Sequence, residues 1–294
     1  MNTLLFWFGY LTIFVLALCA VLWWDRRRRR TKPPFPENLK LLRMPGEYLW
    51  QRVPDNDESD PQWLLLVMLV PLVAGAAVLQ VVSKLQLSLA TRSVVTVIAL
   101  AFSLLLCVRW YQGRLQRRAD DYLGFFGERY VAECLDPLKA QGWFIFHDIP
   151  CVGGAGPFNL DHVALGPGGV WVVETKTRRK GRTRPGRKEH EVVFDGAQII
   201  WPWWEETESL KQAADNAHWL RELIEKLTGK AFDVAAVLTF PGYYVIERRL
   251  GPVRVVNPKL LPQVLVARGN SVLSDADIDL IRRQLEEKCR NVEY

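Results

Sequence analysis

The sequence has few cysteines, and none of them stand in an arrangement that builds a disulfide framework or a zinc finger. The five cysteines are scattered without a C-x-x-C pair, and the four histidines show no metal-ligand spacing. This usage favours reduced thiols facing a cytosol. A phosphate-binding loop is missing too, because the glycine-rich stretch 151–159 lacks the spacing and the trailing Gly-Lys-Ser/Thr. Disulfide scaffolds, zinc fingers and P-loop nucleotide binding are therefore excluded.

Charge is missing from long apolar stretches in the first third of the chain. Residues 3–24 carry no charge over 22 positions, which is enough for a helix to cross a hydrocarbon core of ~30 Å. A secretory signal peptide is disfavoured, since no small-residue cleavage site precedes Asp25. Residues 63–82 and 94–111 are two further candidate spans. No acidic residue lies within the three, so they predict a membrane anchor rather than a transporter or channel.

The distribution of lysine and arginine predicts the orientation of these spans. Arg26–Arg30 follow the first span and several arginines follow the third, whereas the short loop 83–93 holds only Lys84 and Arg92. Positively charged flanks stay in the cytoplasm. We therefore expect a protein integral to the cell membrane, with its N-terminus outside, a solvated cytoplasmic loop at 25–61 and everything after about residue 112 inside.

Residues 1–112 thus form the expected anchor, and residues 113–294 an expected cytoplasmic α/β domain. The domain begins with amphipathic helical spacing that Pro137 bends or splits and Gly142 ends. Period-two and continuous apolar runs then predict strands, separated by helical patterns. The strands are expected at 143–149, 159–165, 169–176, 191–200 and 232–240, with another at "VRVVNP"; the helices are expected at about 206–227, 259–268 and 274–289.

A glycine-rich turn, "GPGG" at 166–169, joins two of these strands and fixes their expected pairing. A symmetric antiparallel turn places Leu165 opposite Val170, and therefore Asp161 opposite Glu174. Opposed side chains lie about 5 Å apart, and two like charges there repel. The period of two puts Lys176 on the same face as Glu174. The hairpin therefore predicts two facing carboxylates with an ammonium group beside them.

Such a pair can be relieved in three ways: by protonation of one acid, by a bridging cation, or by lysine and solvent at a strand end. A hard divalent ion held by two carboxylates beside a lysine suits phosphodiester hydrolysis. An ordinary strand end with a Glu174–Lys176 salt bridge is the simpler alternative.

The arrangement resembles the PD-(D/E)xK nuclease superfamily. More narrowly, "FFGERYVAECLDPL", "NLDHVALGPGGVWVVETKTRRKG" and "LKQAADNAHWLRELI" resemble the nuclease-related domain (NERD). The resemblance implies a restriction-endonuclease-like core: a helix, a three-stranded antiparallel part, a helix and a strand. It implies Mg²⁺ or Mn²⁺ held by Asp161 and Glu174, with Glu128 as an added acid, Lys176 supporting the attacking water, and Gln212 on the following helix. Leu160 stands where the superfamily usually has proline.

A basic arm follows Lys176, with seven basic residues in eleven positions. It is expected to be mobile and to contact phosphates beside the metal site; a solvated hairpin tip or attraction to anionic lipid is the alternative. The arm's basic residues are Arg178, Arg179, Lys180, Arg182, Arg184, Arg187 and Lys188.

The tryptophan cluster "WPWW" at 201–204 favours packing against the core or rest at the membrane interface over stacking on bases. The net charge of +6 agrees weakly with an anionic partner. The expected function is metal-dependent hydrolysis of DNA, with RNA second. The rival is a catalytically inactive nucleic-acid-binding or membrane-tethered scaffold domain. The sequence does not indicate an oligomeric state.

Overall fold

The computed structural model describes residues 20, 23, 40–52, 60–153, 156–267 and 273–292. The first expected span, 3–24, lies outside the described residues except for two single positions. The chain divides into two units, residues 1–41 with 293–294, and residues 42–292. Apart from Leu41, the elements described below belong to the second unit.

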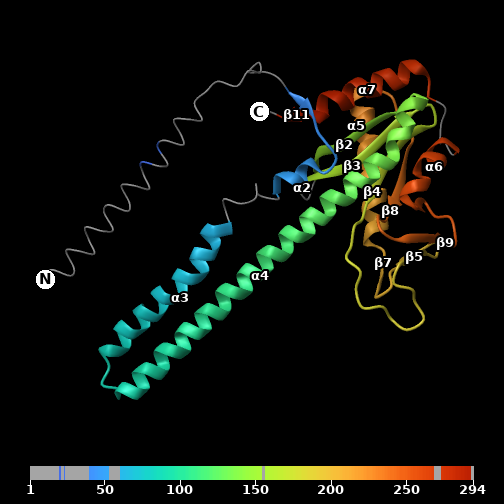
Figure 1. Ribbon diagram of the computed structural model, residues 1–294. Helices are drawn as coiled ribbons and strands as arrows, with labels where there is room; N and C mark the ends of the chain where they lie inside the picture. The colour runs from blue at the N-terminus through green and yellow to red at the C-terminus, as the bar shows by residue number, and fades with distance from the viewer. Residues whose placement is uncertain are drawn as a thin grey trace. The chain divides into compact units, whose positions relative to one another are not determined.

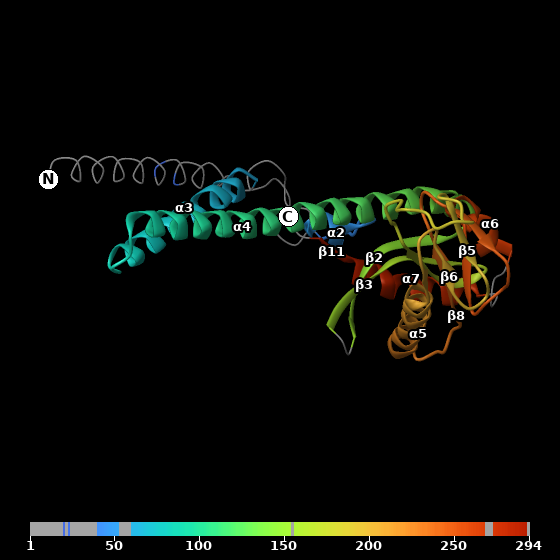
Figure 2. The ribbon, with the colours of Figure 1, turned by 90° about the horizontal axis from the view of Figure 1, so that it is seen from below.

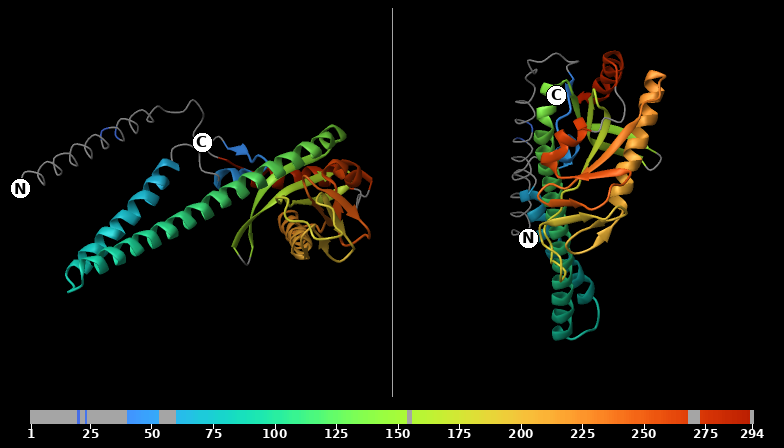
Figure 3. Two further views of the ribbon diagram at one scale, coloured as in Figure 1. Left: turned by 60° about the horizontal axis from the view of Figure 1, so that its bottom comes forward. Right: turned by 90° about the vertical axis from the view of Figure 1, so that its right-hand side faces the viewer.

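Two apolar helices form a hairpin early in this unit. α3 (Asp60–Ser83) contains Pro71, and α4 (Leu89–Leu135) begins after the N-cap Ser88. The two helices lie side by side (Figure 3). Both are long and apolar enough to cross a membrane, judged by length and composition alone. Many of their large apolar side chains are exposed, Met68 at 65% for example. These helices correspond to the second and third expected spans.

α4 runs without interruption through the expected boundary at residue 112. Its first half is apolar, and its last turns pack Val131 and Leu135 into the domain core. A 3-10 turn, Asp136–Gln141, follows with Pro137 in its first positions. Gly142 then ends the helix in the left-handed conformation, at φ 80°. The predicted break at Pro137 and stop at Gly142 are confirmed.

A five-stranded mixed sheet forms the centre of the domain (Figure 1). The strand order is β10-β8-β4-β3-β2, and β8 pairs in parallel with both β10 and β4. β3 pairs antiparallel with β4 and with β2. The predicted helix, antiparallel three-stranded part, helix and strand are all present. The strands are β2 (Phe144–Gly153), β3 (Gly156–Gly166), β4 (Gly169–Thr175), β8 (Val234–Thr239) and β10 (Val253–Val256).

Two helices cover opposite faces of this sheet, α4 one face and α5 (Glu208–Thr228) the other (Figure 2). α5 buries Ala213, Ala217 and Leu220 against one core. β8 contributes Leu238 to the α5 side and Val237 to the α4 side. The prediction of a strand buried on both faces is therefore confirmed for this run.

A second sheet has the order β7-β6-β5-β9 and differs from the sequence-based expectation. The single strand expected at 191–200 is instead two strands, because Asp195 accepts the backbone N–H groups of Ala197 and Gln198 and Gly196 takes a φ of 104°. These contacts form a turn at residues 195–198, which the apolar pattern of the sequence does not indicate. The four strands are β5 (Glu191–Phe194), β6 (Ile199–Ile200), β7 (Glu205–Glu206) and β9 (Tyr244–Glu247).

The segment before α3 also differs from the expectation of a solvated loop. β1 (Leu41–Leu42) and α2 (Glu47–Arg52) occur there, and Glu47 is only 8% exposed. The expectation is wrong for residues 42–52, because this segment packs against the domain. The chain closes as expected with helical turns and a final helix: a 3-10 turn (Pro258–Leu260), α6 (Leu261–Ala267), α7 (Asp275–Cys289) and the short β11 (Arg290–Val292).

Candidate metal and nuclease site

The register of the β3–β4 hairpin is the one that the turn predicts. Leu165 pairs with Val170, and the ladder continues to His162 opposite Val173. One step further along this register, Asp161 stands opposite Glu174. Both acids lie where the ladder ends, so the strands separate at the acids and not before them. The hairpin pairing is confirmed without a slip.

Glu174 and Lys176 form an ion pair in which each side chain has a second partner on α5. The Lys176 Nζ donates to Glu174 Oε1 at 2.7 Å and to Gln212 Oε1 at 2.8 Å. Asn216 Nδ2 donates to Glu174 Oε2 at 2.8 Å. Glu174 is 1% exposed, so its carboxylate is fixed by donors on both oxygens. Gln212 and Asn216, one turn apart on α5, therefore orient the lysine and the acid.

Asp161 is half-buried and bonded on one oxygen. The backbone N–H of Thr175 donates to its Oδ2 at 2.7 Å. Within the described parts of the chain, no hydrogen bond to Oδ1 is found. This carboxylate therefore keeps one oxygen available for a ligand.

Glu128 enters from α4 and is 8% exposed. The helix can approach because of the preceding glycine: a β-carbon at Gly127 would lie 1.8 Å from Thr177 Oγ1 and 2.9 Å from Thr177 Cβ. The glycine in "FGER" thus explains how the acid reaches the end of β4.

The electrostatics of the cluster follow from burial of several like charges. Burial, with Asp148 and Glu174 nearby, raises the pKa of Glu128 to about 8. Burial, followed by Glu174 and Glu128, raises the pKa of Asp161 well above its usual range. Burial acts to lower the pKa of Lys176, but Glu174 and Asp161 outweigh it and the pKa rises. The lysine is therefore a cation at neutral pH. The raised pKa values of Asp161 and Glu128 show that the positive charge near these carboxyl groups is too small to keep both ionised.

A bound divalent ion would supply that positive charge. Among the described residues, no three Asp, Glu, His or Cys side chains already converge as a ligand set. Mg²⁺ does not require three, since it is usually held by one or two carboxylates together with water and substrate phosphates. Asp161 and Glu174 would be those two carboxylates. Glu128 would join as a third only after losing its proton and moving.

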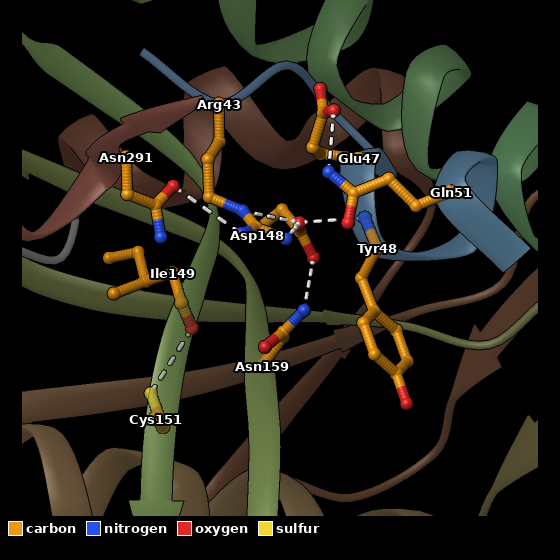
Figure 4. A network of polar contacts seen from close by, with 9 residues as sticks. All are labelled: Arg43, Glu47, Tyr48, Gln51, Asp148, Ile149, Cys151, Asn159 and Asn291. Atoms are coloured by element: carbon orange, nitrogen blue, oxygen red, sulfur yellow. Dashed lines mark hydrogen bonds and ion pairs between the residues drawn. The ribbon is translucent and has the colours of Figure 1, made fainter. Parts of the chain in front are cut away.

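Asp148 on β2 is a further acid that the sequence did not single out. The pairs His147–His162 and Ile149–Leu160 place it opposite Asp161, but its own φ is 50° and no ladder pair forms there. Figure 4 shows Arg43, Tyr48 and Asn159 converging on its carboxylate. Arg43 Nε donates to Oδ2 at 2.7 Å, the Tyr48 N–H donates to the same oxygen at 2.8 Å, and Asn159 Nδ2 donates to Oδ1 at 2.7 Å.

Asp148 is 3% exposed and both of its oxygens are engaged. Burial still raises its pKa in spite of the Arg43 guanidinium. It is therefore an anchoring acid rather than a ligand. The only signal in the sequence was an acidic residue inside an apolar strand. The pairing of β2 with β3 was needed to show that this acid lies opposite Asp161.

Two histidines next to the site, the fully buried His162 and the half-buried His147, contact each other. His162 Nδ1 lies 2.9 Å from His147 Nδ1, and the rings meet edge to face. Burial lowers the pKa of His147 to about 4 and that of His162 well below its usual range. Both rings are therefore neutral near pH 7.

Three arginines of the basic arm form ion pairs with acidic residues outside the arm. Arg184 and Arg187 pair with Glu205, and Arg179 Nε pairs with Asp120 at 3.2 Å. These three arginines of the arm therefore have acidic partners, and the expected phosphate contact stays a prediction. Lys180 and Arg182 are exposed and have no ion pair among the described residues. A cavity of about 460 Å³ lies beside them, lined in part by Thr177, Arg178, Arg179, Lys180 and Trp203.

The tryptophan cluster packs, as favoured by the sequence. Trp201 is fully buried and contacts Phe240 and Tyr243 at ring-centroid distances of 4.8 and 5.2 Å. Trp204 is 37% exposed, and the Arg178 guanidinium lies 5.1 Å from its ring centre. The cluster therefore links the core, through Trp201, to Arg178 at the start of the basic arm.

The fold and the site together define a restriction-endonuclease-like α/β domain whose acids, lysine and glutamine lie at one end of the sheet. The family model of the nuclease-related domain matches residues 123–241. This stretch runs from the last turns of α4 to the end of β8 and contains Glu128, Asp161, Glu174, Lys176 and Gln212. The resemblance seen in the sequence is confirmed over this stretch, and the function is nuclease-related to that extent. No curated protein and no solved structure matches the chain.

Proposed function

We propose that the chain is a membrane-anchored, metal-dependent nuclease that hydrolyses phosphodiester bonds of DNA in the cytoplasm. The observation that carries the proposal is the pair Asp161 and Glu174, opposed across one hairpin with the Lys176 ammonium bonded to Glu174. Asp161 and Glu174 would hold Mg²⁺ or Mn²⁺, and Glu128 is the candidate third ligand. When bound, the ion polarises the phosphate and activates water.

The residues of the chain have distinct parts in this reaction. The oxygen of water bonds to phosphorus, the bond from phosphorus to the leaving sugar oxygen breaks, and the proton that the water loses passes through solvent to that leaving oxygen. Lys176 stays protonated and stabilises the negative charge that develops on the phosphate oxygens. Gln212 fixes the ammonium, and Asn216 fixes Glu174, so neither side chain must reorganise during the step.

The basic arm and the apolar helices supply the rest of the proposal. Lys180, Arg182 and the neighbouring cavity suit the phosphates of a nucleic acid strand. α3 and the first half of α4 suit a membrane anchor, and the arginines after residue 108 favour a cytoplasmic domain.

Cleavage assays on the full-length chain in detergent test the proposal, with duplex DNA, single-stranded DNA and RNA as substrates and with Mg²⁺, Mn²⁺ or a chelator. Glu174→Gln and Lys176→Met should each lower the cleavage rate by about 100-fold or more. The matched controls Glu222→Gln and Lys226→Met, both exposed on α5, should leave it unchanged.

Equal activity of Glu174→Gln and the wild type would reject the assignment. Nucleic-acid binding without metal-dependent cleavage in the wild type would instead support the rival, an inactive binding or scaffold domain.

A further inference from the structure

A cavity of about 800 Å³ lies where α2 packs against α4 (Figure 2), away from the acids of the candidate nuclease site. Its floor is Phe125, which is 7% exposed, and the rings of Trp50 and Tyr122 lie 5.0 and 6.3 Å from the Phe125 ring. The lining residues of α4 follow one another at helical spacings and therefore share one face of the helix. They are Leu115, Arg118, Ala119, Tyr122, Phe125 and Arg129.

This lining combines apolar surface with positive charge. Leu115 and Tyr122 are 41% and 53% exposed, so their apolar surface is open to a ligand. Arg118 and Arg129 are the charged residues, and the Arg129 guanidinium lies 5.9 Å from the centre of the Phe125 ring. Among the described residues that line the cavity, none is acidic. A matching ligand therefore carries an anionic group next to an apolar part.

The cavity begins where the apolar half of α4 ends. At this point the rings of Trp63 and Trp110 lie 5.3 Å apart, and the Arg114 guanidinium lies 4.4 Å from the centre of a Trp63 ring. Tryptophan is enriched at the level of lipid head groups, and arginine side chains reach to that level. Arg118 lies one turn beyond Arg114, about 6 Å along the helix. In a membrane-anchored chain, this end of the cavity therefore lies among the head groups.

We propose that this cavity binds an anionic phospholipid of the adjoining leaflet. Its phosphate pairs with Arg118 and Arg129, and its glycerol and first acyl carbons contact Trp50 and Tyr122. A phospholipid is favoured over a free anion because only the lipid covers the exposed apolar surface. The inference rests on the membrane anchor of the proposed function and not on the nuclease chemistry. The bound lipid would contact α2 and α4 together and so fix the domain against the membrane.

Native mass spectrometry of the full-length chain in detergent tests the proposal, by titration with phosphatidylglycerol and with phosphatidylcholine. The wild type should bind one phosphatidylglycerol more tightly than phosphatidylcholine, by about 10-fold or more. Arg129→Gln should weaken phosphatidylglycerol binding by about 5-fold. The matched control is Arg117→Gln, because Arg117 is exposed on the same helix and does not line the cavity. This control should bind like the wild type.

A second variant separates a cavity from general attraction between lipid and surface arginines. Ala119→Trp fills the cavity without changing any charge, and it should bind phosphatidylglycerol no more tightly than phosphatidylcholine. Glycerol phosphate at the lipid's concentration should not displace phosphatidylglycerol, because it lacks the acyl chains. Where thermal melting shows that Ala119→Trp does not fold, the comparison of Arg129→Gln with Arg117→Gln decides.

The outcomes separate this inference from the proposed anchor. A full-length chain recovered in the soluble fraction of cells would overturn the anchor and the lipid site together. A chain recovered with the membranes that binds the two lipids equally, or equally well as wild type and Arg129→Gln, would overturn the lipid site alone. Displacement of the lipid by glycerol phosphate would reduce the cavity to an anion site. Loss of DNA affinity in Ala119→Trp with unchanged lipid binding would assign the cavity to nucleic acid instead.

Discussion

Gly127 and Gly113 lie on the same helix, α4, and the structure predicts opposite results when each is replaced by alanine. A β-carbon at Gly113 would meet nothing within 4 Å. Gly113→Ala should therefore show only the gain in helix propensity, about 1 kcal/mol. A β-carbon at Gly127 would lie 1.8, 2.9 and 3.1 Å from three atoms of Thr177. Because one of these is Cβ, rotation of the threonine cannot remove the clash.

The magnitude follows from setting the two effects against each other. Overpacking of this severity costs about 3 kcal/mol, at the upper end of the usual range. After the propensity gain of about 1 kcal/mol, Gly127→Ala should lose about 2 kcal/mol. At roughly 3 °C per kcal/mol for a domain of this size, the melting temperature should fall by about 6 °C and that of Gly113→Ala should rise by about 3 °C.

Thermal unfolding of both variants in detergent, followed by tryptophan fluorescence, measures the difference. Adding Thr177→Ala to Gly127→Ala removes two of the three crowding atoms and should recover part of the loss. A Gly127→Ala variant that melts above the wild type, as Gly113→Ala should, would refute the close approach of α4 to the end of β4.

Three other predictions concern charge. Burial raises the pKa of Glu128 from its ordinary value of 4.5 to about 8, so between these pH values the folded metal-free state keeps a proton that the unfolded state releases. The stability of the metal-free state should therefore fall as pH rises through this window, while Mn²⁺ affinity and the Mn²⁺-induced thermal shift should grow. A thermal shift that does not depend on pH would contradict the assignment. Asp148→Ala should lower the free energy of unfolding, measured with a chemical denaturant, by about 3–5 kcal/mol, because it leaves the Arg43 guanidinium buried without its partner. Asp120→Ala breaks an exposed ion pair and should lower it by less than about 1 kcal/mol. Equal losses in the two variants would contradict the difference in burial. Neutralising Lys180 and Arg182 together should reduce the slope of log DNA affinity against log salt concentration by about 2, whereas Lys226→Gln should leave the slope unchanged. An unchanged slope in the double variant would show that Lys180 and Arg182 do not contact the nucleic acid.

The sequence predicted the hairpin well because its determinants are local. A glycine-rich turn sets the register, and a period of two carries that register to Asp161 and Glu174. Lys176 and Gln212 were brought together by the strand and helix pattern combined with the family resemblance. The helix stop at Gly142 and the buried strand before Phe240 were equally readable.

The missed features depend on contacts between distant segments. The apolar run 191–200 looks like one strand, and only the Asp195–Gly196 pair signals the turn that divides it. Asp148 acquires its meaning from the β2–β3 register and from Arg43, which is more than 100 positions away. Proline and acidic residues around α2 suggested solvent, because composition does not reveal that a short segment is buried by packing elsewhere.

The continuity of α4 ties the angular position of Glu128 to everything that precedes it on that helix. Each residue of an α-helix advances the direction of the side chain by about 100°. A single insertion between residues 112 and 122 would therefore swing the carboxylate away from β4, or else rotate the whole apolar half by the same angle. An insertion of eleven residues, close to three full turns, would restore the direction while lengthening the helix by about 16 Å. The spacing between the apolar half and the acid can therefore change only in near-whole turns.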